Sequence, residues 1–329
     1  MRVLFIGGSG MISTAVSRAA IAAGCEVYLL NRGSRPALPG SQGLIADAHR
    51  PSDVRAALGS LEFDVIVDWV AYTPDDAERD LALFRGRVGQ YVFISSASVY
   101  QKPPEHYLIT ESTPLHNPYW EYSRNKIACE ERLMKAYRDE SFPVTIVRPS
   151  MTYDQNLPIA LGGWGTYTLA DRLKRSRPII VHGDGSSLWV VTHADDLARG
   201  LLGLLGNERA LGEVFHITSD EVLTWNQIYG AIAEALGVQA NIVHVPSDFI
   251  AQVAPEHAGS LLGDKTWSVV FDNSKIKSFV PGFAAVVPFS EGILRTLAWF
   301  AADERRQHVD DAVNAEMDRI LAAYGRATT

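Results

Sequence analysis

A tyrosine and a lysine stand four residues apart in the segment YWEYSRNKIACEERL, residues 119–133. The segment is predicted to be helical, so Tyr122 and Lys126 would lie one turn apart on the same face. A positive charge beside a phenol stabilises the phenolate and lowers its pKa. Tyr122 could then act as a general acid or base near neutral pH. A surface helix with an ordinary tyrosine and lysine would have the same spacing, so other parts of the chain must decide between the two.

Short apolar runs alternate with helical patterns through the first half of the chain. Apolar strands separated by amphipathic helices become parallel strands joined by helical crossovers, so this half predicts an α/β fold with a doubly wound, Rossmann-type parallel sheet. Ligands of such sheets bind beyond the carboxyl ends of the strands. We expect strands at residues 3–6, 26–30, 43–46, 64–70, 91–94 and 144–147, and helices between them at 11–24, 51–61 and 74–86.

The pattern loosens after residue 150. Residues 151–168 are rich in glycine, proline and aromatic residues, as loops around a pocket would be. We predict a Rossmann domain of residues 1–150 plus 191–218, and a smaller α/β substrate domain of residues 151–190 plus 219–329. Further elements are expected as helices at 168–176, from near 193, at 224–237 and at 304–325, and as strands at 178–183 and 214–218.

The glycine-rich segment GGSGMIS, residues 7–13, connects the first strand to the first helix. Gly7 would permit the tight turn, and Gly10 would let the backbone approach a pyrophosphate at the helix N-terminus. Ser13 replaces the third glycine of the dinucleotide motif, and serine is small enough for close packing. The turn therefore predicts a dinucleotide site at Gly7, Ser9, Gly10, Met11 and Ile12, although a glycine-rich connection without a ligand would need the same residues.

The end of the second strand lies beside the adenosine ribose in dinucleotide sites. Asn31 and Arg32 follow this strand and no carboxylate does, which favours NADP over NAD, because a guanidinium suits a 2′-phosphate. Asn31 could also bond a free ribose, and Arg32 could be a solvated loop residue. Asp47, after the third strand, is placed to accept from the adenine amino group or to cap the helix that follows.

The composition limits the possible functions. The chain has 329 residues, 47% of them hydrophobic, and a formal net charge of −8, so it can bury a large core and is poorly suited to nucleic acid. Cys25 and Cys129 have neither metal-ligand spacing nor a disulfide framework, so we expect no metal. The N-terminus lacks signal-peptide organisation and no apolar run could span a membrane, so we expect a cytoplasmic protein without membrane contact.

Five motifs, in this order and at this spacing, resemble the extended short-chain dehydrogenase/reductase superfamily, and in particular its NAD-dependent epimerase/dehydratase family. They are GGSGMIS (7–13), ISSASVY (94–100), the Tyr122–Lys126 pair, VRPSMTYD (147–154) and VVTHADDLARG (190–200). The resemblance covers most of the chain. It implies an enzyme with a nicotinamide cofactor, a small-molecule substrate and, as is common in this family, a homodimer formed through helices such as 75–86 and 119–138.

The resemblance also implies roles for individual residues. Tyr122 would exchange a proton with the substrate hydroxyl, Lys126 would lower the tyrosine pKa and bind the nicotinamide ribose, and Ser96 would hydrogen-bond the reacting oxygen. Ala71 and Arg148 are assigned to the cofactor, with Arg148 near the nicotinamide carboxamide.

The reaction and the substrate are less well determined. Dehydratases of the family carry an Asp-Glu pair after the catalytic Ser or Thr, but Ala97 and Ser98 stand here, so dehydration is disfavoured. The arginine that pairs with a diphosphate in nucleotide-sugar enzymes is also missing, since Leu188 and Trp189 occupy that region. A basic cluster nearby could substitute for this arginine or could form a solvated helix face. It consists of Arg172, Lys174, Arg175 and Arg177.

Candidate substrate-binding residues are Ser98, Trp164, Tyr167 and Trp189, although aromatic residues are more often part of the core. We therefore predict an NAD(P)-dependent epimerase of a sugar-containing molecule, such as a nucleotide sugar, sugar phosphate or nucleoside. An NADP-dependent dehydrogenase or reductase is the alternative. An RNA-binding protein of the same fold, like the chloroplast stem-loop binding proteins, and a cofactor-bound sensor or scaffold are more remote.

Overall fold

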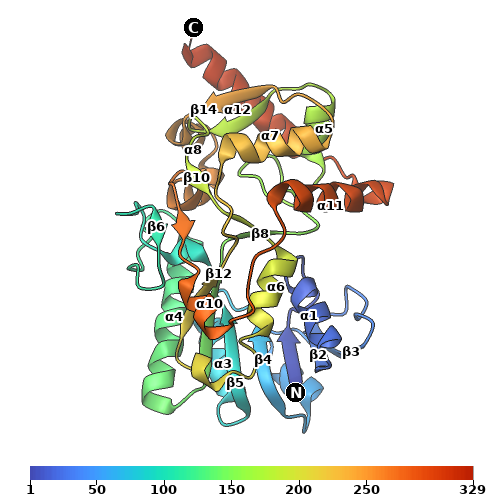
Figure 1. The fold of residues 1–329 in the computed structure, drawn as a ribbon, viewed down its shortest axis with the longest axis vertical. Helices are drawn as coiled ribbons and strands as arrows, with labels where there is room; N and C mark the ends of the chain where they lie inside the picture. The colour runs from blue at the N-terminus through green and yellow to red at the C-terminus, as the bar shows by residue number, and fades with distance from the viewer. Residues whose placement is uncertain (329) are drawn as a thin grey trace.

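The computed structural model describes residues 1–328, and a seven-stranded parallel sheet forms its lower part in Figure 1. The strand order is β12-β7-β5-β4-β1-β2-β3, which confirms the predicted doubly wound sheet. The order reverses between β1 and β4, where such sheets open a crevice for a ligand. The strands are β1 (Arg2–Ile6), β2 (Glu26–Asn31), β3 (Ser41–Ile45), β4 (Phe63–Asp68), β5 (Val88–Ile94), β7 (Val144–Pro149) and β12 (Val214–Ile217).

Helices cover both faces of this sheet. Side chains alternate across a strand, so Val3 and Phe5 pack toward α1 (Ser13–Ala22) and α6 (Ala194–Leu202), whereas Leu4 and Ile6 pack toward the other face. That second face is covered by α2 (Pro51–Leu58), α3 (Pro74–Phe84) and α4 (Glu121–Glu140). Burial on both faces explains why the strands are continuously apolar in the sequence.

A second group of elements lies above the sheet in Figure 1, around its own apolar core. Strands β9 (Ile179–His182) and β14 (Ile242–Val245) pair in parallel, as do β8 (Met151–Tyr153) and β11 (Val191–His193). The helices here are α5 (Thr168–Lys174), α7 (Trp225–Ala235), α8 (Ser247–Val253), α9 (Ala258–Ser260), α11 (Phe289–Ala301) and α12 (Asp311–Thr328). The division into two domains at the boundaries given above stays a prediction.

Short elements complete the fold. Helix α10 (Ser274–Phe279) packs beside β12, and the 3₁₀ turns are Ala97–Val99, Glu208–Ala210, Pro255–His257 and Glu304–Arg306. Residues Leu261–Lys265 form a π-helical turn. The remaining strands form two-residue pairings: β6 (Leu108–Ile109) with β15 (Val270–Phe271), and β10 (Leu188–Trp189) with β13 (Leu223–Thr224).

Two predicted boundaries were wrong for a local reason. The strand expected over 64–70 ends at Asp68, because its Oδ1 accepts the N–H groups of Val70 at 2.6 Å and Ala71 at 2.9 Å and turns the chain. The final helix begins at Asp311 instead of residue 304, because the Asp303 side chain caps a separate 3₁₀ turn. Within residues 1–328, no helix is long and apolar enough to cross a membrane.

A buried ion pair joins α4 to β7. Arg148 donates from Nη2 to Glu130 Oε2 at 2.5 Å and from Nε to Glu130 Oε1 at 3.0 Å, and its guanidinium lies 4.8 Å from the centre of the Tyr100 ring. Burial works against the charged guanidinium, but the Glu130 charge outweighs it, so the pKa of Arg148 is raised. The pair holds the middle of α4 against the sheet.

Replacing Arg148 with methionine should destabilise the protein by about 3–5 kcal/mol, because the Glu130 carboxylate would stay buried without its cation. Urea unfolding followed by circular dichroism measures this cost. The matched control is Arg132→Met on α4, the helix that carries Glu130; the pair of Arg132 with Glu78 is partly exposed and should contribute less than about 1 kcal/mol. Equal costs for the two variants would contradict the structural role given to the buried pair.

Candidate active site

The start of α4 is fixed by Asn117, a residue that the sequence analysis did not single out. Its Oδ1 accepts the N–H groups of Tyr119 and Trp120, each at 3.2 Å, and so replaces bonds that a helix start lacks. Its Nδ2 donates to the carbonyls of Ser98 at 2.8 Å and Gly263 at 2.6 Å. The buried amide of Asn117 thus holds the first turn of α4 next to the two segments that contain Ser98 and Gly263.

Lys126 lies next to the carboxyl ends of strands β4 and β5. Its Nζ donates to the backbone carbonyls of Ala71 at 2.7 Å and Ile94 at 2.8 Å, and it lies 4.7 Å and 4.8 Å from the ring centres of Tyr72 and Phe93. The side chain is buried, and burial lowers its pKa to about 8 because the charged form loses its hydration. Ala71, predicted to contact the cofactor, is fully buried and instead supplies an anchoring carbonyl to Lys126.

The chain that carries Ala71 is itself held by buried carboxyl groups. Besides bonding the N–H groups of Val70 and Ala71, Asp68 lies next to Asp80, and Tyr91 donates to Asp80 Oδ2 at 2.7 Å. Burial and the neighbouring Asp68 charge raise the pKa of Asp80 well above its ordinary value, and Arg79, whose Nε donates to Asp80 Oδ1 at 2.9 Å, opposes this rise. These hydrogen bonds fix the backbone at Val70 and Ala71, which carries the carbonyl that Lys126 binds.

Tyr122 is half-buried and lies on the same side of α4 as Lys126, whose Nζ is 5.9 Å from the phenol ring centre. Its ring packs on Trp120 at 4.9 Å between centres. Burial raises the pKa of Tyr122 to about 12, and hydrogen bonding to Ser96 only partly offsets this effect. The expected lowering of this pKa by Lys126 is therefore absent from this structure, and the phenol is protonated at neutral pH.

Three serines lie beside the phenol. Ser96 accepts the N–H of Ser98 at 3.2 Å and so caps the turn Ala97–Val99. The hydroxyls of Ser96 and Ser98 are 2.9 Å apart, and Ser123 donates to Ser98 Oγ at 2.7 Å. Both predicted serines line the cavity next to Tyr122, but Ser98 is buried and already engaged, so Ser96 is the freer donor to a substrate.

The glycine turn has the shape expected of a nucleotide cradle. Gly7 has φ of +79°, and a Cβ there would lie 2.5 Å from Val70 Cγ1, so any side chain would be both strained and clashing. Ser13 donates to the Gly7 carbonyl and accepts from Gly10 N–H, each at 2.8 Å, and thus braces the turn where the motif has a third glycine. The backbone N–H groups of Met11 and Ile12 bond no acceptor among the described residues. These features fit a bound pyrophosphate at the start of α1.

A cavity of about 410 Å³ continues from this turn toward the ends of β2 and β3. Arg32 and Arg35 both line it, and Arg32 has no bonding partner within residues 1–328. Arg35, which the sequence analysis missed, donates to the Ser9 carbonyl and stands three residues after Arg32 in the same loop. Asn31 and Asp47 also line the cavity, but Asn31 Oδ1 accepts the N–H of Gly33, and Asp47 accepts that of His49 at 3.1 Å.

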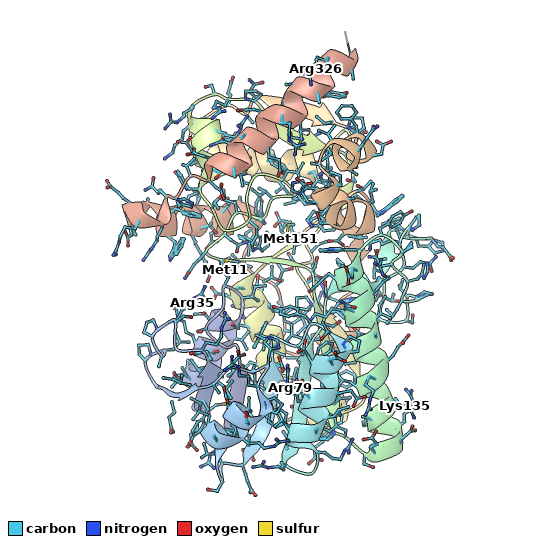
Figure 2. All side chains as sticks on the ribbon, turned by 180° about the vertical axis from the view of Figure 1, so that it is seen from behind. Met11, Arg35, Arg79, Lys135, Met151 and Arg326 are labelled. Atoms are coloured by element: carbon cyan, nitrogen blue, oxygen red, sulfur yellow. The ribbon has the colours of Figure 1, made fainter. Side chains whose placement is uncertain are left out.

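The cavity continues past Tyr122 and Lys126 into the space between the lower and upper parts of the molecule. A middle section of about 330 Å³ contains Met11, Ile12, Tyr122 and Lys126, and shares Ile12, Ser96 and Tyr122 with an upper section of about 310 Å³. Figure 2 shows Met11 and Met151 near the level where the two parts meet. A dinucleotide in the lower sections would therefore end beside Tyr122, below the upper section.

The upper section has aromatic walls. Trp164 and Trp189 both line it, as predicted for substrate-binding residues, although Trp164 is 47% exposed and Trp189 is buried against Trp225. The remaining candidate, Tyr167, does not reach the cavity, because it packs on Phe300 in the core of the upper part. Its assignment to the substrate was wrong.

Arg148 and the basic cluster considered for a diphosphate also lie away from the cavity. Arg148 points into its ion pair with Glu130, and its neighbours Pro149 and Ser150 line the cavity in its place. The basic cluster does not supply a diphosphate clamp: Arg172 is fully buried on Pro178 and Asn314, and Arg175 and Arg177 pair with Asp171 and Asp318. None of the cluster lines the described cavity.

Comparison with known proteins agrees with this geometry. The model of the NAD dependent epimerase/dehydratase family matches residues 3–218. The chain belongs to that family. It is 30% identical over 290 residues to 2′-dehydrokanamycin reductase of Streptomyces kanamyceticus, covering 86% of this chain and 80% of that protein. It is 29% identical to the chloroplast stem-loop binding protein of 41 kDa b of Arabidopsis thaliana, covering 75% and 67% of the two chains.

Solved structures of this epimerase/dehydratase family share the fold. An epimerase from Methanothermobacter thermautotrophicus superimposes with a TM-score of 0.77 at 18% identity, covering 92% of this chain and 93% of that one. A UDP-glucuronic acid 4-epimerase from Bacillus cereus, solved in complex with NAD, gives 0.72 at 18% identity, with 93% and 100% covered. The family and these relatives identify the protein as an enzyme.

The pKa of Lys126 makes the stability of the protein depend on pH. The lysine pKa is about 8 in the folded chain and 10.5 when exposed, so between these values the unfolded state binds more protons and the free energy of unfolding rises with pH. The free energy of unfolding of the wild-type protein, taken relative to that of Lys126→Met, should therefore rise by roughly 2 kcal/mol from pH 8 to pH 10.

Urea unfolding across this pH range measures the difference. Lys135→Met, which removes an exposed lysine from the same helix, is the matched control and should give a difference that does not change with pH. A flat difference for Lys126→Met as well would mean that Lys126 is not desolvated in solution.

Proposed function

We propose that this enzyme reduces a ketone on a sugar-containing small molecule to a secondary alcohol, with NADPH as the cofactor. The observation that carries the proposal is the position of Tyr122, next to Ser96, where the nucleotide cavity opens into a pocket that no arginine lines. A neutral phenol is the form that donates a proton to a carbonyl oxygen.

The proposed cofactor site uses the whole lower cavity. The pyrophosphate would lie on the N–H groups of the glycine turn, and the adenosine end would lie between the loop after β2 and Asp47. Lys126, at the base of the middle section, would bind the nicotinamide ribose. When bound, the reduced nicotinamide supplies the hydride that adds to the carbonyl carbon.

The chain itself would supply the proton and the charge stabilisation. Ser96 Oγ hydrogen-bonds the carbonyl oxygen and polarises it, and Tyr122 transfers its phenolic proton to that oxygen as the negative charge develops. The Lys126 ammonium stabilises the resulting phenolate. Solvent then returns a proton to Tyr122 for the next turnover.

Two observations favour net reduction over the epimerisation predicted from the sequence. The UDP-glucuronic acid 4-epimerase described above is named for a nucleotide sugar, whereas three of the four basic residues considered for a diphosphate here, Arg172, Arg175 and Arg177, are committed to Asp171, Asn314 and Asp318. The relative with 30% identity is named as a reductase. Epimerisation through a transient ketone is the second candidate, supported by the family and by the epimerases among the solved structures.

The preference for NADPH is supported by Arg32 and Arg35, two guanidinium groups at one end of the cavity. Planar guanidinium groups bind phosphate oxygens by paired, charge-assisted bonds. We also propose a homodimer that forms through α3 and α4, because the family often dimerises through such helices. A cytoplasmic location is proposed from the sequence composition.

Replacing Tyr122 with phenylalanine should lower the rate of ketone reduction by on the order of 10²–10⁴, since the proton donor is lost while the ring packing is kept. The test follows oxidation of NADPH by ultraviolet absorbance with a panel of ketopyranosides, offered both free and linked to a nucleoside diphosphate. Tyr119→Phe, at an exposed position just before the helix, is the control and should leave the rate unchanged. A fully active Tyr122→Phe enzyme would rule out the proposed proton donor, and activity restricted to nucleotide-linked sugars without net cofactor oxidation would favour the epimerase.

Replacing both Arg32 and Arg35 with alanine should weaken NADPH binding by at least roughly tenfold and leave NADH binding within about twofold, because only NADPH carries the 2′-phosphate. Titration calorimetry with each nucleotide measures both constants. The double variant Arg55→Ala/Arg138→Ala removes the same two charges from exposed positions outside the cavity and controls for net charge. An equal loss for NADPH and NADH would assign these arginines to a feature that the two cofactors share.

A further inference from the structure

The upper section of the cavity contains a lysine that neither the catalytic mechanism nor the cofactor site uses. Lys102 comes from the loop after the turn Ala97–Val99, and only 2% of its surface is exposed. Within residues 1–328 its ammonium has no hydrogen bond and no ion pair. A buried cation without a partner is costly, and in an enzyme cavity it indicates that a ligand completes its bonding.

A second lysine and one carboxylate lie on the opposite wall. Asp264 and Lys265 belong to the π-helical turn Leu261–Lys265, and the two side chains are 3.8 Å apart. The turn is fixed in place because the Lys265 carbonyl accepts hydrogen bonds from His182 Nε2 at 2.9 Å and Trp225 Nε1 at 3.1 Å. π-Helical turns occur frequently at functional sites, and this one presents two charged groups to the cavity.

The charges of this section do not balance. Asp264 is its single carboxylate, and it interacts electrostatically with both Lys102 and Lys265. Two lysines thus share one carboxylate, and burial lowers the pKa of both lysines and raises the pKa of Asp264, because each charged form loses its hydration. An anionic group on a ligand would favour the charged form of both lysines and would give the Lys102 ammonium a bonding partner.

We propose that Lys102, with Lys265, binds a carboxylate or phosphate group of the substrate, so that the ketone carried by the same molecule is presented to Tyr122 and Ser96. The inference rests on the proposed function, because it takes the upper section as the substrate site. It adds that the substrate is an acidic sugar derivative, with the anionic group directed away from the reacting carbon.

The indole rings around the section suit the sugar part of such a molecule. Trp120 lies under the Lys265 ammonium, 5.5 Å from Nζ to the ring centre, and also packs on Tyr122. Trp189 closes the opposite side. An amino sugar fits this charge pattern poorly, since its ammonium group would meet Lys102 as a like charge.

The test compares four probes built on the same methyl glucoside ring by titration calorimetry, with and without NADP⁺. They are methyl glucoside, methyl glucuronide, methyl glucoside phosphorylated on its primary hydroxyl, and methyl glucoside with an amine in place of that hydroxyl. The wild-type protein should bind at least one of the anionic probes roughly tenfold more tightly than the neutral one, and the amine most weakly. The anionic probe that binds more tightly, the glucuronide or the phosphate, shows whether the site prefers a carboxylate or a phosphate group.

Variants then assign the preference to a residue. Lys102→Met should remove the preference for the anion without weakening the neutral probe, and Lys102→Arg should retain it. Lys174→Met, at an exposed lysine of α5 outside the cavity, should change nothing. Anionic probes that bind no better than the neutral one, or a preference that survives Lys102→Met, would overturn the proposal.

The two proposals fail separately. An anion preference in a protein that never oxidises NADPH would leave the Lys102 site standing and reject the proposed reductase. Reduction of neutral ketopyranosides without any anion preference would do the reverse.

Discussion

The site depends on one interaction, the pair of hydrogen bonds from the Lys126 ammonium to the carbonyls of Ala71 and Ile94. These carbonyls stand where the chain leaves β4 and β5, next to the point at which the strand order reverses. A buried ammonium must be bonded, so it holds α4 at a fixed height over the sheet. Tyr122, one turn earlier on the same helix, is thereby placed at the junction of the nucleotide cavity and the upper pocket. Asn117 at the helix start and the Glu130–Arg148 pair near its middle restrict the same helix further.

The placement has a chemical consequence. Burial raises the pKa of Tyr122 above its ordinary value, and the Lys126 ammonium lies 5.9 Å from the phenol ring centre, where it could stabilise a phenolate formed by proton transfer. Such a group suits donation of a proton to a ketone. The glycine turn and the two arginines after β2 lie at the other end of the same cavity, so the proposed cofactor and substrate meet at one phenol.

Much of this arrangement follows from local patterns in the sequence. A four-residue spacing fixes Tyr122 and Lys126 on one helix face, and a strand–glycine–helix sequence fixes the cradle of Gly7 and Gly10, because both depend on backbone geometry within a few residues. The alternation of apolar runs and amphipathic helices likewise gave the doubly wound sheet. These features needed no knowledge of distant contacts.

Other features depend on contacts between distant segments, and sequence patterns do not encode them. Arg148 turns away from the cavity because Glu130, eighteen positions earlier, competes for its guanidinium. Tyr167 is drawn into the core by Phe300. The group of Lys102, Asp264 and Lys265 forms only when a loop from the first half meets a π-helical turn near the end of the chain. Arg35 had a local signal in its spacing from Arg32, which was missed.

The central claim is that the enzyme exchanges a nicotinamide cofactor at every turnover. Mass spectrometry of the nucleotide released on denaturing the purified protein tests it most directly, combined with a titration of the same preparation with NADPH. The account predicts little retained nucleotide and reversible binding of one NADPH per chain. Stoichiometric, tightly held NAD would contradict net reduction and indicate the internal redox cycle of an epimerase, and failure to bind either nucleotide would contradict the proposed site itself.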